Sequence, residues 1–116
     1  MLLNISNHPS ARWPETQVKI AQETYGQIED LPFPMIDPTF NQEEVEQLAL
    51  KFSEQVAKSE ASAVHLMGEM CFTFNLVQKL KEMGLAVVAS TTKRNVEEVN
   101  GKKIVQFEFV QFRPYF

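Results

Sequence analysis

The sequence has little cysteine and little glycine, and each shortage excludes a class of protein. The single cysteine, Cys71, leaves no partner for an internal disulfide and too few thiolates for a cysteine-rich zinc site. We interpret it as a small, buried packing residue. The chain has four glycines and no phosphate-binding glycine motif, which argues against ordinary dinucleotide or nucleoside-triphosphate enzymes. Two isolated histidines give no metal-ligand spacing, so we expect neither a metal nor a cofactor.

Long apolar runs and a broad excess of positive charge are also missing. No apolar run approaches the roughly 20 residues that a membrane-spanning helix needs, and the first residues lack the pattern of an export signal. We therefore expect a cytoplasmic protein with no membrane partner. The net charge of −4 argues against binding to duplex nucleic acid. Residues 61–116 carry seven Lys/Arg against five Asp/Glu, which leaves room for a small phosphate ligand.

The pattern of the chain is organised around residues 62–94. Residues 63–67 are a short apolar run of strand length, and the next apolar residues fall at helical spacing until Gly84. Residues 85–89 are a nearly continuous apolar run, typical of a strand buried on both faces. Such a strand-helix-strand unit is parallel and right-handed, so both strands end at the same edge of the sheet. We expect Ser90 to Arg94 to open at that edge.

Similar signals predict the elements that precede this unit. Residues 2–6 indicate a short central strand, and Pro14 suits the first turn of a helix over residues 14–25. Three prolines in residues 27–38 permit only a short edge strand there. Asn41 and Glu44 then have the spacing of a capping box that begins a second helix.

The end of the chain has the pattern of a β-hairpin. Asn100-Gly101 predicts a two-residue type I′ turn, and residues 102–112 alternate between apolar and polar side chains. That turn would pair Arg94 with Phe107 and Val88 with Arg113. We interpret the phenylalanines of the last strand as core residues on a covered face.

Together these elements predict an α/β fold with a single domain over residues 1–116. It is a three-layer, Rossmann-like sandwich around a mostly parallel sheet of strand order 2-1-3-4-5, with an antiparallel C-terminal edge strand. The order reverses between the first and third strands, and open parallel sheets bind ligands at such a switch point.

Polar side chains are concentrated in the segments that leave the carboxyl ends of the predicted strands. Hydroxyls, an amide, a histidine and two adjacent cations suit an anion or a nucleotide. The candidate ligand-binding residues are Asn7, Ser10, Trp13, Thr73, Ser90, Thr91 and Thr92, and the candidate catalytic residues are His8, Glu69, Lys93 and Arg94. The alternative is that these residues shape turns, cap a helix or continue a strand.

Two of these candidates have a side chain suited to proton transfer. His8 lies in a loop at the predicted switch point, where it can exchange a proton near neutral pH. Glu69 suits a base or a ribose contact, but a carboxylate that opens a helix is also a routine stabilising choice. Trp13 suits base stacking or packing under the loop. His65 lies inside a strand, so we interpret it as a packed histidine and leave it out.

The loops of this chain resemble those of the small Rossmann-like proteins of CRISPR systems. The features that carry the resemblance are the polar loop at Ser6 to Ser10, the Gly68-Glu69 turn and the run from Ser90 to Arg94. CARF-type sensors and stand-alone ring nucleases of antiviral defence bind cyclic oligoadenylate at a dimer interface. The resemblance implies a homodimer and a metal-independent phosphodiesterase, a hydrolase that opens the ring by in-line attack of a ribose 2′-hydroxyl. It further implies that Lys93 and Arg94 steady the phosphate, that His8 or Glu69 assists proton transfer, and that Ser10 and Thr91 orient the ribose-phosphate.

Two other functions fit the same sequence. A non-catalytic module would hold a nucleotide or an anion at the same edge without cleaving it. A protein-interaction domain would dock another chain through the last strand, at Phe107, Phe109 and Phe112, or through residues 113–116. An exposed sheet edge also makes a homodimer plausible.

Overall fold

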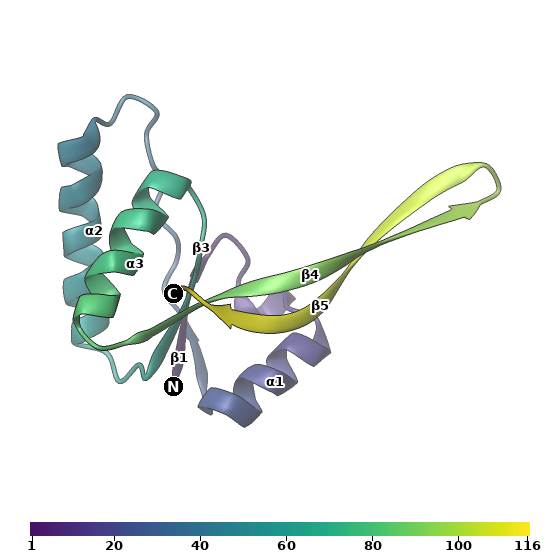
Figure 1. Ribbon diagram of the computed structural model, residues 1–116, viewed down its shortest axis with the longest axis horizontal. Coiled ribbons are helices and arrows are strands. Elements are labelled where there is room, and N and C mark those ends of the chain that lie inside the picture. The colour runs from purple at the N-terminus through teal and green to yellow at the C-terminus, as the bar shows by residue number, and fades with distance from the viewer.

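Five strands form one sheet in the order β2-β1-β3-β4-β5 in the computed structural model, which describes residues 1–116 (Figure 1). They are β1 (Leu2–Ser6), β2 (Ile28–Asp30), β3 (Ala63–Met67), β4 (Ala86–Val99) and β5 (Lys102–Pro114). The first four strands run parallel, and β5 is antiparallel to β4. The predicted α/β fold and strand order are confirmed, and the switch point lies between β1 and β3.

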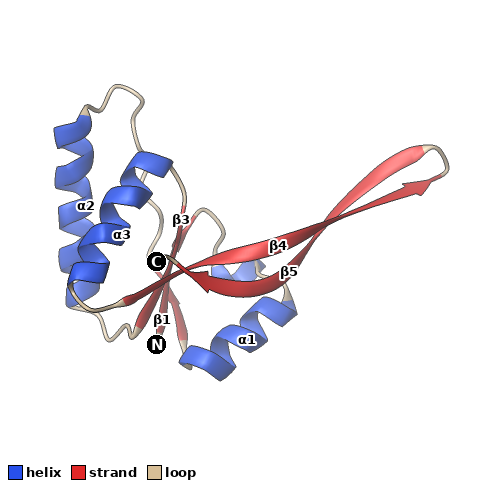
Figure 2. Cartoon of the chain, in the orientation of Figure 1, coloured by secondary structure: helices blue, strands red, loops and turns tan.

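Three α-helices cover the two faces of this sheet. They are α1 (Glu15–Tyr25), α2 (Gln42–Ala57) and α3 (Met70–Glu82), and a short 3₁₀ turn, η1 (Ser10–Arg12), precedes α1. In Figure 2, α2 and α3 pack side by side on one face while α1 lies on the other. The predicted three layers are therefore present.

Alternation along β1 divides the core between the two faces. Leu3 and Ile5 point to α2 and α3 and belong to a cluster of 13 buried residues that includes Phe72, a fully buried residue of α3. Leu2 points to α1 and belongs to a smaller cluster that contains Trp13. Because neighbouring positions of a strand face opposite ways, Asn4 is also directed to the α1 side, where it is buried.

The helix boundaries follow the predicted caps within one residue. Asn41 accepts a hydrogen bond from the Glu44 backbone N–H, and the Glu44 carboxylate accepts one from the Asn41 N–H, so the capping box is confirmed. Pro14 is the residue before α1 rather than its first residue. Gly84 follows α3 with a φ of +81°, which favours glycine.

The hairpin turn is as predicted, but its strands contain a β-bulge. Asn100 and Gly101 have φ values of 54° and 76°, which fit a type I′ turn, and Arg94 lies opposite Phe107. An extra residue in β5, Val110, interrupts the ladder between Thr91 and Thr92. The pairing beyond it is shifted by one, so Val88 faces Pro114 and the predicted pairing with Arg113 is wrong.

The distal part of this hairpin projects from the body as a two-stranded arm, residues 93–108 (Figure 1). The ladder between β3 and β4 ends at Val88, so beyond it β4 continues with only β5 beside it. No side chain of the arm is buried. The interpretation of the last strand as core is wrong for Phe107, which is 65% exposed, and correct for Phe109.

Two further expectations are wrong. Ser90 to Arg94 do not leave the sheet at the edge where β3 ends, because β4 runs through them and on to Val99. Cys71 is exposed on α3 rather than buried, since it lies outside the apolar stripe of that helix. None of the helices has the length and apolar character needed to cross a membrane.

Candidate functional site

A network of buried polar groups lies beneath the carboxyl edge of the sheet at the switch point. The Asn4 side chain is its centre: Nδ2 donates to the His8 carbonyl oxygen and to Asp30 Oδ1, both at 2.9 Å. Asn4 Oδ1 accepts from the Ser6 hydroxyl at 2.8 Å and lies 2.8 Å from Nδ1 of His65. All four hydrogen-bonding positions of the amide are therefore used.

His65 is held in this network as a neutral ring. Since Asn4 Oδ1 is an acceptor, the proton of the imidazole lies on Nδ1, and Nε2 is buried without a partner. The ring packs against Trp13 at 5.1 Å and Phe112 at 5.6 Å between centroids. Burial and, to a smaller extent, the neighbouring His8 together lower the pKa of His65 to about 4. His65 therefore carries no proton at Nε2 at neutral pH.

The network fixes the backbone of the loop after β1 while leaving its side chains free. The His8 carbonyl oxygen also accepts from Trp13 Nε1 at 2.9 Å, and the Asp30 carboxylate accepts from the backbone N–H and hydroxyl of Ser10. Asn7 and His8 themselves are exposed. The loop thus presents an amide and an imidazole from a rigid base.

Two adjoining hollows open at this edge. One, of about 260 Å³, is lined by the loop after β1 together with Asp30 and residues 31–33. The other, of about 320 Å³, lies between Asn7, residues 33–36 and Glu69. Asn7 and Phe33 line both. The structure therefore brings two of the predicted residues, Asn7 and Glu69, to one place.

Phe33 supplies an aromatic side chain to these hollows. Its ring packs edge-on against Phe72 at 5.2 Å between centroids and lies directly on the backbone of Gly68. A Cβ at Gly68 would overlap the Phe33 ring, so glycine is needed there for the ring to lie this close. A half-buried aromatic beside amide and carboxylate groups suits the face of a base.

Glu69 both caps α3 and lines one of the two hollows. Its Oε1 accepts a hydrogen bond of 2.7 Å from the Phe72 N–H and so caps α3. Its side chain also lines the second hollow and is exposed. One carboxylate oxygen therefore remains available to a ligand.

Three other candidates are occupied or buried. Trp13 is 8% exposed and packs in the core, as the packing interpretation predicts. The Ser10 hydroxyl donates to Asp30 at 2.8 Å. Thr73 is buried, has an unpartnered Oγ1 and lines a separate hollow of about 680 Å³ beside α3 and Phe116.

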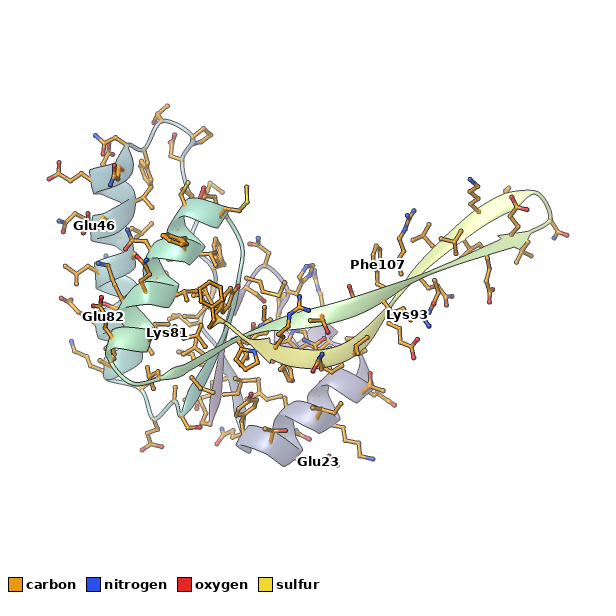
Figure 3. The ribbon with its side chains drawn as sticks, in the orientation of Figure 1. Glu23, Glu46, Lys81, Glu82, Lys93 and Phe107 are labelled. Atoms are coloured by element: carbon orange, nitrogen blue, oxygen red, sulfur yellow. The ribbon has the colours of Figure 1, made fainter.

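The candidates on β4 lie away from the two hollows. Ser90 donates to Met67 Sδ, and the Thr91 hydroxyl bonds the backbone of Gln111 at the bulge. Ser90 marks the level at which β3 ends, and Thr92 continues the strand beyond it. Lys93 and Arg94 belong to the arm, where Figure 3 shows Lys93 beyond the body. Arg94 lies about 13 Å past Ser90 along the strand, at roughly 3.3 Å per residue.

Sequence reasoning missed five residues that build the site: Asn4, Ser6, Asp30, Phe33 and His65. The sequence does contain a signal for Asn4 and Ser6, because polar residues within an otherwise apolar central strand must find hydrogen-bond partners once they are buried. His65 was correctly read as packed, but its partner was not identified. Phe33 carries no local signal, because its place depends on Gly68, which is far away in the chain. No three histidine, cysteine, aspartate or glutamate side chains lie close enough together to hold a metal ion.

Comparison with known proteins gives one match. The chain belongs to the Uncharacterized protein MJ1673 family, whose model matches residues 1–113. No curated protein and no solved structure matches the chain.

Proposed function

We propose that this member of the MJ1673 family binds a cyclic oligoadenylate at the carboxyl edge of its sheet and opens the ring without a metal. The observation that supports the proposal most is the pair of joined hollows at the switch point. They combine the amide of Asn7, a free carboxylate oxygen of Glu69 and the ring of Phe33, and the exposed imidazole of His8 belongs to the same loop as Asn7 but lines neither hollow. These groups suit the hydroxyls, phosphate and base of one nucleotide.

The hollows are small for an entire cyclic oligonucleotide. Their volumes of about 260 and 320 Å³ lie just below and just above the lower limit of the range for small-molecule pockets, which begins at about 300 Å³. One chain therefore holds a part of the ring, and a second copy related by two-fold symmetry holds the rest. A symmetric ligand such as cyclic tetra-adenylate fits this arrangement.

The proposed reaction is an in-line displacement within the bound ring. A ribose 2′-oxygen attacks the adjacent phosphorus, the bond to the 5′-oxygen breaks, and the product is a linear chain with a 2′,3′-cyclic phosphate and a free 5′-hydroxyl. The free oxygen of Glu69 takes the proton of the 2′-hydroxyl. The His8 imidazole gives a proton to the leaving 5′-oxygen, and Asn7 orients the phosphate.

Lys93 and Arg94 have no role at the phosphate bound by their own chain. Within one chain they lie too far along the arm to reach a phosphate in the hollows. Any positive charge at the phosphate must therefore come from elsewhere, and a second copy is one source.

Cleavage by defined variants tests the proposal. Purified protein is incubated in EDTA with cyclic tetra- and hexa-adenylate, and the products are separated by chromatography. We expect linear products from the natural protein and a rate at least about 100-fold lower for both His8→Ala and Glu69→Gln, because each removes one proton-transfer group. Glu69→Gln keeps an oxygen that can cap α3, so the fold is preserved.

A matched control separates this effect from a general loss of charge. Glu60→Gln removes an exposed carboxylate before β3, at the opposite edge of the sheet, and should cleave at the natural rate. Binding without products would leave a sensor or sponge and would refute the catalytic part. If the protein neither binds nor cleaves the ligand, the proposed site is refuted.

A further inference from the structure

The arm exposes an apolar surface that the chain itself does not cover. Val96 and Val105 lie opposite each other on one face, and Phe107 lies beside them. Their side chains are 51%, 40% and 65% exposed. An isolated two-stranded ribbon is at best marginally stable in water, and further strands with a shared apolar face stabilise it. The arm therefore has the properties of an element that is completed by another chain.

One edge of the arm is also open. β4 pairs with β3 only as far as Val88, and β5 occupies its other side. From Ala89 to Val99, the outward backbone groups of β4 have no neighbouring strand. An unpaired edge of this kind accepts another strand by continuing the ladder.

The charges along the open edge of β4 indicate which strand pairs with it. Two cations, Lys93 and Arg94, are followed by Asn95 and Val96 and then by two anions, Glu97 and Glu98. Charges of one sign would repel a second copy of the strand. Because the order is reversed by an antiparallel arrangement, the cationic end of this segment in each copy instead lies against the anionic end of the segment in the other.

A two-fold axis at Val96 fits both the charges and the apolar face. It places Arg94 opposite Glu98 of the second copy, and the Val96 side chains opposite each other. Since Val105 lies beside Val96 within each arm, four valines then form one apolar stripe across four strands. The two Arg94-Glu98 pairs flank this stripe.

We infer that the arms of two copies pair in this way, β4 against β4, and form a four-stranded antiparallel ribbon that holds a homodimer together. The occupant of the arm is a second copy of this chain. The interface is isologous, because each arm provides the same edge and the same face.

The same register brings the tip of each arm to the site of the other copy. Val99 of the second copy falls beside Lys93, and the Asn100-Gly101 turn that follows it lies near Thr92, beyond the end of β3 at Met67. Lys102 and Lys103, which follow the turn, lie at the level of Lys93 and Arg94 of the first copy, but on the side of β4 where β3 and β1 end. If the proposed function holds, these lysines supply the positive charge that the hollows of one chain lack, and this step alone rests on that function.

Two charge reversals test the dimer directly. Arg94→Glu leaves two anions facing each other across the axis, and Glu98→Arg leaves two cations. We expect each variant alone to weaken dimerisation at least 10-fold in sedimentation equilibrium, against a chain mass of 13.3 kDa. An equimolar mixture of the two variants should form a heterodimer of natural affinity, because one cross-axis pair is then the natural Arg-Glu pair and the other is restored with reversed polarity.

The controls make the outcomes decisive. Lys19→Glu reverses an exposed charge on α1 and should leave the dimer unchanged, and far-ultraviolet circular dichroism verifies that every variant is folded. A monomeric natural protein, single variants that remain dimeric, or a mixture that stays monomeric would each overturn the inference. Ligand binding is measured separately, so a dimer without cyclic oligoadenylate binding would refute the proposed function and leave the interface standing.

Discussion

Asn4 determines much of the local structure at the switch point. Its amide joins β1 to the loop after it, to β2 through Asp30 and to β3 through His65. A polar side chain at the centre of a buried strand is costly unless all its groups are paired, and here they are. The loop that carries Asn7 and His8 is positioned as a consequence.

His65 makes the stability of the fold depend on pH. Its pKa is about 4 when folded and 6.5 in the reference state, so between these values the unfolded chain binds a proton that the folded chain does not. Stability from this group is therefore complete above pH 6.5 and is lost as the pH falls towards 4. We expect the free energy of unfolding to fall by on the order of 3 kcal/mol over this range.

Urea denaturation at pH 7 and pH 4.5 measures this effect. The matched variant His65→Gln keeps a donor for Asn4 but cannot titrate, so its stability should change less over the same range. Equal pH dependence in the two proteins would show that His65 is not the titrating group.

The sequence correctly predicts the position of site residues that follow the end of a short strand. It does not predict the position of residues on β4, because it does not show how far that strand continues. Asn7 and Glu69 follow β1 and β3, whose ends meet because the strands are parallel. Lys93 and Arg94 were placed with them because Ser90 and Thr91 resemble the end of a buried strand. The strand instead continues to Val99 through exposed residues that are mostly charged or polar and not typical of strands, so the local pattern does not show how far it runs.

Element by element, the local signals are strong in the body and weak in the arm. Caps, apolar stripes and the Asn100-Gly101 turn correctly locate the helices and the hairpin. The bulge at Val110 has no sequence signature, and the residues that follow it are shifted by one so that Phe112 packs near Trp13 and Tyr25 on the α1 side. Alternation in the last strand predicts one covered face, but no other part of the chain lies over the arm.

The arm should be dispensable for the fold of the body. Replacing residues 94–107 by Asn-Gly would join Lys93 to Glu108, a pair that is already opposite, through a turn of the natural type. No buried side chain is removed, so we expect the monomer's free energy of unfolding to change by less than about 1 kcal/mol. Sedimentation equilibrium should show a monomer, and urea denaturation at low protein concentration gives its stability. Loss of the folded body would mean that the arm contributes to the core.

At the scale of the whole molecule, the site in the body and the arm have complementary roles in the proposed dimer. The body provides two small hollows at the end of a parallel sheet, and the arm provides a symmetric means of bringing two bodies together. The molecule measures 50 × 37 × 25 Å, and the arm accounts for its long axis (Figure 1). A ligand with two-fold symmetry matches such an assembly, whereas a mononucleotide would need only one chain.

The most direct test of this account is the stoichiometry of binding. Cyclic tetra-adenylate with 2′-fluoro sugars lacks the attacking hydroxyl and therefore stays intact during isothermal titration calorimetry. The account predicts saturation at one ring for every two chains, and weaker binding by Asn7→Ala. Saturation at one ring for each chain, or no heat of binding at all, would contradict it.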